Sequence, residues 1–294
     1  MRALGLLAAA ASLTFGILVI APPAFAPTLS VPGQYATIAE AMEAAPAGAT
    51  IQLGPGSYGP LVISKPISLL GAPNLASRIV AGDGTTAIAI RDVYGVRLQG
   101  LVIEGRDYGV TVDEASAVQL IGNRVVGAAL AGIRLSRAAA LISGNELRAG
   151  TGPYGMGIEV ANTMSRPASV ITRNVVAGAT REGIVLHNSH AMIESNTVTG
   201  NGLRGVSISE MSMATVAKNT IMDNADAGIW VVDSSMADVA GNHIGAMRPG
   251  PEGRLNGIGV FYYGEVIVGG GNRIDVDADR AIVATFGGIV GSRH

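Results

Sequence analysis

The chain has 294 residues, of which 14% are charged, and its formal net charge is −2 at pH 7. A nearly neutral chain without a basic face argues against nucleic acid as a partner. The sequence contains no cysteine, which excludes disulfide bonds and leaves the core alone to hold the fold. With 41 glycines and only 4% aromatic residues, the composition favours repeated tight turns around a narrow aliphatic core.

Residues 1–26 have the pattern of a signal peptide. A short positive start is followed by an apolar or small stretch to Ile20, and a small-x-small cleavage pattern ends at Ala26. This segment predicts a periplasmic or secreted protein whose mature domain spans residues 27–294. The apolar stretch is long and Pro27 follows the cleavage pattern, so an uncleaved membrane anchor is the alternative. Membrane contact is expected only in that alternative.

A short helix is expected at about 36–46. Thr37 and Glu40 form a capping box, helix-forming residues follow, and a proline and a glycine end the pattern. Such a helix would cover the open core of a solenoid's first coil. Two apolar runs, Ile51–Leu53 and Leu61–Ile63, would then begin the coil.

An asparagine recurs at near-regular intervals through the rest of the chain, with gaps of 22, 29, 22, 23, 23 and 30 residues. Its positions are Asn123, Asn145, Asn174, Asn196, Asn219, Asn242 and Asn272. A glycine followed by Ile or Val keeps step with it, at Gly109, Gly132, Gly157, Gly183, Gly205, Gly228 and Gly257. A fixed period in this range is typical of a stacked-repeat solenoid.

Within each repeat, apolar and small or polar residues alternate. In the run that begins at Met213, Ala214 and Val216 would face inward, and Thr215 and Ala217 outward. No stretch between such runs is long and periodic enough for a crossover helix, which excludes α/β folds. Short strands that return every repeat must pair in parallel with the copy above. We therefore predict an all-β, single-stranded parallel β-helix, with the right-handed coil that is usual for this period.

The recurring residues have structural interpretations. An Asn amide carries donors and an acceptor, so each copy could satisfy an inward turn and the copy one coil away. Asn also tolerates the left-handed conformation that such a turn needs. The recurring Gly is interpreted as a bend residue and not as a phosphate loop. Phe286 is expected to plug the C-terminal end of the coil.

The opening of the coil resembles that of many pectin-lyase-like β-helix proteins. The similar segments are Tyr35–Ala41, Ala47–Ile51, Gly54–Tyr58 and Ile63–Gly71, and the resemblance extends over residues 34 to 285. Within this superfamily the chain is most similar to NosD-type periplasmic proteins with carbohydrate-binding and sugar-hydrolase repeats. The resemblance implies an exported, right-handed coil.

The same resemblance implies two kinds of activity. Enzymatic members of the superfamily act on acidic polysaccharides as lyases, hydrolases or C5-epimerases, whereas NosD-type members assist copper-site assembly in nitrous oxide reductase. The sequence departs from the enzymatic members, because it lacks the Asp-Pro-His-Asp signature of alginate epimerases and the aspartate sets of pectate lyases and polygalacturonases.

Outward-facing columns follow each Gly of the repeat, and successive members of a column lie about 4.8 Å apart. Glu210 and Asp233 fall on neighbouring coils, near the spacing of a retaining glycosidase pair, and His187 lies one coil away as a candidate base. These three are the candidate catalytic residues. The candidate substrate-binding residues are Trp230, Arg134, Glu159, Arg137, Asn188 and Tyr262. The alternative is that all of them are solvated strand ends.

The candidate substrate-binding residues combine two chemistries. Their aromatic rings would stack on sugars, and their arginines would hold carboxylates. The two long repeats would add loops beside this face, over Arg148–Tyr154 and Arg248–Arg254.

A different column carries His190, Met213 and Met236. Thioether and imidazole are soft ligands that suit Cu(I), so these three residues are a candidate metal site. The alternative is that the methionines only fill space.

Three functions remain open. The first is an exported protein that binds an acidic polysaccharide and, if it is an enzyme, acts on it as a lyase, glycoside hydrolase or C5-epimerase. The second is a NosD-like periplasmic accessory protein in copper handling. The third is a non-catalytic scaffold for another exported protein. The sequence requires no cofactor, and no specific motif selects calcium or copper.

Overall fold

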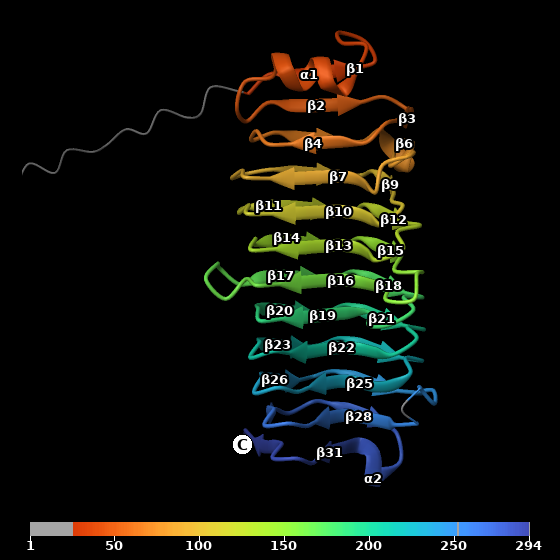
Figure 1. Cartoon of the computed structure of the whole chain (residues 1–294), viewed down its shortest axis with the longest axis vertical. Helices are drawn as coiled ribbons and strands as arrows, with labels where there is room; N and C mark the ends of the chain where they lie inside the picture. The colour runs from red at the N-terminus through yellow and green to blue at the C-terminus, as the bar shows by residue number, and fades with distance from the viewer. Residues whose placement is uncertain (1–25, 252, 294) are drawn as a thin grey trace, which may run out of the picture.

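The computed structural model describes residues 26–251 and 253–293. The predicted signal segment therefore lies outside the described residues, apart from Ala26. The chain winds into an elongated stack of coils in which three parallel sheets of 12, 10 and 10 strands run the length of the molecule (Figure 1). Between the two ends of the stack, each coil contributes one strand to each sheet, and the strand pairs are parallel, as predicted.

Sheet 1 has 12 strands: β1 (Thr28–Val31), β2 (Thr50–Leu53), β5 (Ser68–Leu70), β8 (Arg97–Gln99), β11 (Val118–Ile121), β14 (Ala140–Ser143), β17 (Ser169–Thr172), β20 (His190–Glu194), β23 (Met213–Ala217), β26 (Met236–Ala240), β29 (Glu265–Val268) and β32 (Ile289–Ser292). Sheet 2 has 10 strands: β3 (Gly56–Tyr58), β6 (Ser77–Val80), β9 (Val102–Glu104), β12 (Arg124–Val126), β15 (Glu146–Arg148), β18 (Val175–Ala177), β21 (Thr197–Thr199), β24 (Thr220–Met222), β27 (His243–Gly245) and β30 (Arg273–Asp275).

Sheet 3 has 10 strands: β4 (Leu61–Ile63), β7 (Thr86–Arg91), β10 (Tyr108–Asp113), β13 (Ala131–Ser136), β16 (Met156–Ala161), β19 (Ile184–His187), β22 (Arg204–Ser209), β25 (Asp226–Val231), β28 (Leu255–Val260) and β31 (Ile282–Ala284). The helical segments are α1 (Ile38–Ala44), the 3-10 turn η1 (Pro73–Leu75) and α2 (Ala278–Ala281).

The core is a column of aliphatic side chains enclosed by the three sheets. In β23, Val216 is fully buried and Thr215 is exposed, which confirms the predicted alternation. In the same register of sheet 1, the coils above and below Val216 place Ile193 and Val239, both buried. Each coil therefore covers the apolar side chains of its neighbour.

The predicted asparagine ladder is confirmed. From Asn123 to Asn272, each side-chain amide donates to the carbonyl oxygen of the next Asn at 2.9–3.1 Å. Asn219, for example, also donates to the Ile193 carbonyl and accepts from the backbone N–H of Asn196.

The expected left-handed conformation of these asparagines is wrong. The residue before each Asn has the positive φ instead, as at Lys218 (54°) and Gly241 (66°). The Asn itself must point its amide into the stack, so the turn is made one residue earlier.

The interpretation of the recurring glycines as bend residues is also wrong. Gly205 and Gly228 lie inside β22 and β25, and neither has a positive φ. A Cβ on Gly205 would lie 2.4 Å from Cγ2 of Ile221 and 2.7 Å from the Gly228 carbonyl oxygen. Glycine is required because the neighbouring sheet and the next coil approach the strand this closely.

The N-terminal cap is confirmed. Helix α1 begins after Thr37, whose side chain accepts from the Glu40 N–H while the Glu40 carboxylate accepts from the Thr37 N–H. Lys65 ties the end of the helix to the coil by donating to the carbonyls of Met42 and Ala45. In the described part of the chain, no helix is both long and apolar enough to cross a membrane.

The expectation that Phe286 plugs the C-terminal end is wrong. Its side chain is 65% exposed and stacks on Tyr262 on the outside of the coil, with ring centroids 5.1 Å apart. Its backbone φ of 52° explains the outward placement, because Phe286 occupies a corner turn and not an inward strand position.

Candidate functional site

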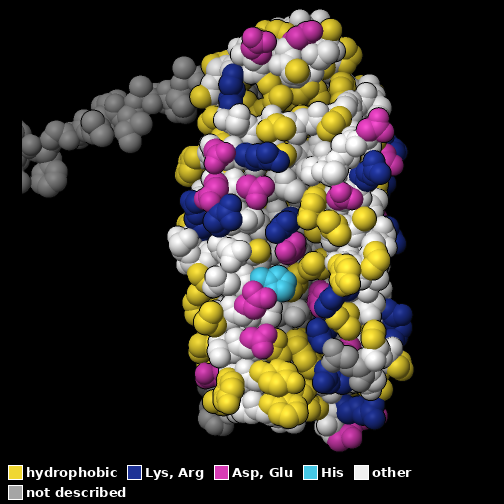
Figure 2. Space-filling view, in the orientation of Figure 1, with side chains coloured by type: hydrophobic (Ala, Val, Ile, Leu, Met, Phe, Trp, Pro, Cys, Tyr) yellow, Lys and Arg dark blue, Asp and Glu magenta, His cyan; other side chains and the backbone are white. Residues whose placement is uncertain are grey.

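A pocket of about 520 Å³ lies on the outer face of sheet 3. Its floor is formed by β19, β22 and β25, and Tyr154 and Arg254 from the two predicted loops line its border. Figure 2 shows this face, where acidic side chains and a histidine gather to one side of lysine or arginine side chains. The two extended loops therefore flank the same hollow.

The three candidate catalytic residues lie together at one end of this pocket. The register Leu186↔Ile208↔Val231 brings the carboxyl ends of β19, β22 and β25 side by side. His187, Glu210 and Asp233 occupy or directly follow these ends, and all three line the pocket. Glu210 and Asp233 both have positive φ values, 58° and 55°, because each turns the same corner of its coil.

The hydrogen bonds of His187 define its tautomer. Its Nδ1 lies 3.1 Å from Oε1 of Glu210 and 3.1 Å from Oγ of Ser209. The Ser209 hydroxyl donates its own hydrogen to the Leu186 carbonyl at 2.9 Å, so its oxygen is left as an acceptor toward the ring. With two acceptors beside it, Nδ1 carries the hydrogen, and Nε2 of the neutral ring is the acceptor.

The opposite end of the pocket holds an arginine–carboxylate cluster. Arg204, at the amino end of β22, lies 3.3 Å from Glu182 and 3.4 Å from Asp226, on the coils on either side. Burial lowers the pKa of the Arg204 guanidinium, and the Glu182 and Asp226 carboxylates oppose this effect. Arg181 lies 3.3 Å from Glu182 but keeps 40% of its side chain exposed. Arg181 is therefore better placed than Arg204 to meet an anion from solvent.

Trp230 lines the floor of the pocket, but its ring is covered and offers no open face for the predicted stacking on sugar. It is only 4% exposed, with the Arg204 guanidinium 4.4 Å from its ring centroid and Phe261 stacked at 4.3 Å. Arg254, from the loop 246–254, lies 4.9 Å from the same ring. The strand pattern correctly points Trp230 out of the core, but these neighbours cover it.

Apart from Tyr262, the remaining predicted binding residues lie outside the pocket. Arg134, Glu159 and Arg137 belong to earlier coils, whereas Asn188 directly follows His187 at the end of β19. Arg134 and Glu159 are register partners and form an ion pair at 3.3 Å. Arg137 pairs with Glu114, and Asn188 donates to Asn162 at 3.4 Å.

The Arg137–Glu114 pair extends to a third group, because Glu114 also pairs with Arg166 at 2.6 Å. The Arg137 and Arg166 guanidiniums hold the pKa of the Glu114 carboxyl below its usual value. Of the predicted binding residues, only Trp230 and Tyr262 reach the pocket.

Sequence reasoning missed the arginine end of the pocket. Glu182 and Arg204 both directly precede a Gly of the repeat, Gly183 and Gly205. The position before the recurring Gly therefore indicates that Glu182 and Arg204 lie side by side on neighbouring coils. Asp226 carries no such signal, because its contact with Arg204 depends on how the two coils stack.

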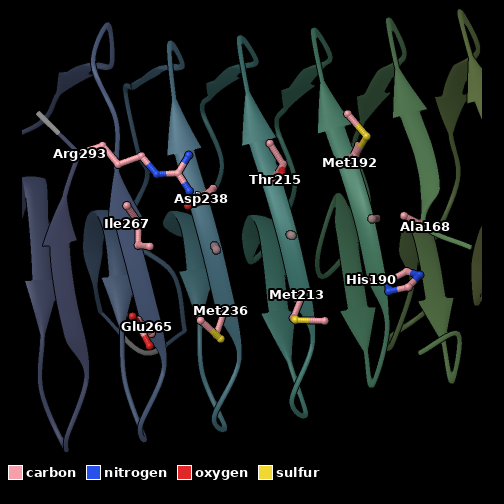
Figure 3. A pocket seen from close by; sticks show the side chains of 13 residues that line it. Ala168, His190, Met192, Met213, Thr215, Met236, Asp238, Glu265, Ile267 and Arg293 are labelled. Atoms are coloured by element: carbon pink, nitrogen blue, oxygen red, sulfur yellow. Dashed lines mark hydrogen bonds and ion pairs between the residues drawn. The ribbon is translucent and has the colours of Figure 1, made fainter. Parts of the chain in front are cut away.

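The candidate metal column is formed as predicted. His190, Met213 and Met236 are register partners on β20, β23 and β26, and Figure 3 shows them on successive strands. They line a second pocket of about 420 Å³ on sheet 1. The two methionines are 44% exposed, and the His190 Nε2 atom is buried without a hydrogen-bond partner. Among the described residues, no three His, Cys, Asp or Glu side chains cluster closely enough to hold a metal ion.

Comparisons with known proteins identify the architecture. The family model described as the right-handed beta helix region matches residues 86–244, in agreement with the predicted handedness. Among solved structures, a pectate lyase superposes with a TM-score of 0.63 at 11% identity, over 90% of this chain and 78% of that chain. No curated protein matches the sequence.

Two further solved structures share the fold. The periplasmic alginate epimerase AlgG superposes with a TM-score of 0.57 at 13% identity, covering 84% of this chain and 61% of that chain. An alginate lyase from Paenibacillus sp. str. FPU-7 has a TM-score of 0.52 at 16% identity, covering 90% of this chain and 98% of that chain. At these identities the likeness concerns the fold alone, and with the family model it confirms the predicted right-handed parallel β-helix.

Proposed function

This chain belongs to the right-handed β-helix family, and we propose that it is an exported protein that binds an acidic polysaccharide across the pocket of sheet 3. The observation that carries the proposal is the pocket itself, with arginines at one end and paired carboxylates at the other. Proteins of the same fold that act on pectate and alginate support a polysaccharide as the ligand. The signal-like pattern of residues 1–26 supports export.

The arginine end provides the contact for a sugar carboxylate. Arg181 is the exposed member, and its guanidinium can donate two parallel hydrogen bonds to a carboxylate. Glu182 and Asp226 hold Arg204 behind it, and Trp230 packs on the guanidinium face. A site built in this way is rigid before the ligand arrives, which lowers the entropic cost of binding.

The carboxylate end supports hydrolysis over elimination or epimerisation. The latter two reactions remove the proton beside a sugar carboxylate, and they need a cation at that carboxylate to stabilise the developing charge. Arg181, Arg204 and Arg254 precede or begin their strands, and the Arg204 and Arg254 guanidiniums pack on Trp230. Glu210 instead has the His187 ring as its neighbour.

In hydrolysis, the glycosidic C–O bond breaks while one carboxyl group protonates the leaving oxygen, and water supplies the new hydroxyl on the anomeric carbon. Glu210 and Asp233 lie on neighbouring coils, about 4.8 Å apart along the stack, which suits the short carboxylate separation of a retaining pair. The His187 Nδ1–H orients the Glu210 carboxylate.

The test is to follow reducing ends and unsaturated products when the protein is incubated with a panel of uronate-containing polysaccharides. We expect reducing ends without unsaturated products, and a loss of about 100-fold in kcat for Glu210→Gln and for Asp233→Asn. Glu194→Gln, which changes a carboxylate on sheet 1, is the control and should keep full activity. Unsaturated products, or activity that survives both substitutions, would contradict hydrolysis at this site.

A second candidate function is copper handling, as in a NosD-like accessory protein. It is favoured by the unpartnered His190 Nε2 beside the two exposed thioethers of Met213 and Met236. Anaerobic titration with Cu(I) should then show sub-micromolar binding, weakened at least tenfold when both methionines are changed to leucine. Equal binding by the wild type and the double variant would remove this candidate.

A further inference from the structure

The pocket of sheet 3 separates its charges by strand polarity. All strands of the sheet run in the same direction, so their amino ends form one border of the pocket and their carboxyl ends the other. The three arginines that line the pocket, Arg181, Arg204 and Arg254, lie at the amino border. Glu210 and Asp233 lie at the carboxyl border, where His187 Nδ1 lies 3.1 Å from Oε1 of Glu210.

The two borders differ in charge. The amino border holds the three arginines of the pocket, of which Arg181 keeps 40% of its side chain exposed. The carboxyl border holds Glu210 and Asp233, and the Arg204 and Arg254 guanidiniums lie over the Trp230 ring between the two borders. A sugar carboxylate is therefore favoured at the amino border and repelled at the carboxyl border.

An exposed aromatic patch continues the carboxyl border toward the C-terminal end of the molecule. It consists of Tyr262, Tyr263 and Phe286, whose side chains are 49%, 74% and 65% exposed. Tyr262 also lines the pocket, and it stacks on Phe286 with ring planes 10° apart. Gly287 makes room for the patch, because a Cβ there would lie 2.8 Å from the Tyr263 ring. Hydrophobic side chains gather over the last coils of this face in Figure 2.

Carboxylates beside aromatic rings suit a neutral sugar. The hydroxyls of a neutral pyranose donate to carboxylates, and its C–H faces pack on aromatic rings. A uronic acid in the same place would add a third negative charge beside Glu210 and Asp233. In this chain an exposed aromatic patch is informative, because aromatic residues make up only 4% of the sequence.

We propose that the ligand is a mixed polysaccharide, in which a uronic acid unit binds at the amino border and a neutral unit binds at the carboxyl border and the aromatic patch. This inference rests on the proposed function and narrows its substrate class. The expected preference for two kinds of sugar unit distinguishes this chain from a protein that binds a polymer made of uronic acid alone.

The test is calorimetric titration of the full chain with three oligosaccharides of equal length: one of uronic acid alone, one of neutral sugar alone, and one that alternates the two. The alternating oligosaccharide should bind about tenfold more tightly than either of the others. Equal binding of the uronic acid oligosaccharide, or of the neutral one, overturns the inference. In the first case the proposed function still stands, whereas failure of every acidic oligosaccharide to bind overturns both.

Three variants test the assignment of each border. The double variant Tyr262→Ala, Phe286→Ala should weaken binding of the alternating and the neutral oligosaccharide about tenfold and leave the uronic acid oligosaccharide unchanged. Asp233→Asn should strengthen binding of the uronic acid oligosaccharide several-fold, and Arg181→Gln should weaken only ligands that carry a carboxylate. Tyr94→Ala, which removes an exposed tyrosine far along the stack, is the matched control. Identical changes for all three ligands would contradict the division into two borders.

Discussion

At the scale of single residues, the buried asparagines hold the corner between sheets 1 and 2. The Asn219 amide donates to the Ile193 carbonyl at 2.8 Å and to Asn242 at 3.0 Å. Its oxygen accepts from both the backbone and the side chain of Asn196. Few other side chains of this size carry donors and an acceptor in the required positions. The ladder therefore has a structural role, and it leaves the outer face of the coil to other residues.

Replacement of one asparagine of this ladder should lower the free energy of unfolding. Asn219→Ala leaves the buried Asn196 N–H and the Ile193 carbonyl without their partners, at about 1–3 kcal/mol for each group. We expect a loss of about 3 kcal/mol in the free energy of unfolding, measured by urea denaturation. Asn188→Ala is the control, because Asn188 makes a single long bond to Asn162, and it should cost only about 1 kcal/mol, the penalty of placing alanine at a φ of 45°. Similar losses for the two variants would refute a special role of the ladder.

At the scale of elements, each strand of sheet 3 begins where it passes closest to sheet 2. The glycine near the start of β22, Gly205, faces Ile221 of β24 and the backbone of the next coil. The same arrangement recurs at Gly228, whose Cβ would lie 2.5 Å from Cγ2 of Ile244. The close approach is what allows Arg204, one residue before Gly205, to lie beside carboxylates from both adjacent coils. The strand corner thus positions the arginine end of the pocket.

A methyl group at this corner should disrupt the packing. Gly205→Ala should destabilise the fold by about 2–3 kcal/mol, because the new Cβ would overlap both Ile221 and the Gly228 carbonyl. Gly59→Ala should be neutral or slightly stabilising, since a Cβ there meets no atom within 4 Å. Thermal unfolding followed by circular dichroism compares the two. A tolerated Gly205→Ala would show that the corner is not tightly packed.

At the scale of the whole molecule, parallel stacking aligns the residues at equivalent repeat positions, so that they form one border of the molecular surface. Every coil delivers its strand in the same direction, so residues at equal repeat positions line up along the axis. Two coils carry extended loops, and one loop of each contributes to the pocket of sheet 3, through Tyr154 and Arg254, whereas the extended connection 162–168 between β16 and β17 does not. Helix α1 closes the N-terminal end, whereas the aromatic patch remains exposed near the C-terminal end. The candidate site therefore lies in the C-terminal half of the stack.

Much of this could be predicted from local patterns. The capping box needs only residues three apart, and the grouping of Glu210, Asp233 and His187 follows from repeat spacing once the strands are parallel. Burial of Trp230 could not be predicted, because Arg254 and Phe261 reach it from the next coil, 24 and 31 residues later in the chain. The left-handed corners were also misassigned, since a period identifies which residue recurs but not its φ angle.

The sequence by itself determined the parallel coil, its asparagine ladder, its cap and the outward columns, because each depends on a period that repeats in every coil. Only the tertiary structure decided which columns meet in a pocket, since that depends on loops that occur once. It also decided the polarity of the site: contacts between coils place Arg204 between Glu182 and Asp226 at one border, with His187 and its neighbouring carboxylates at the other. The repeat spacing determines which residues are neighbours along the axis of the coil. The burial of an outward side chain such as Trp230 depends instead on contacts with residues that do not recur in every coil.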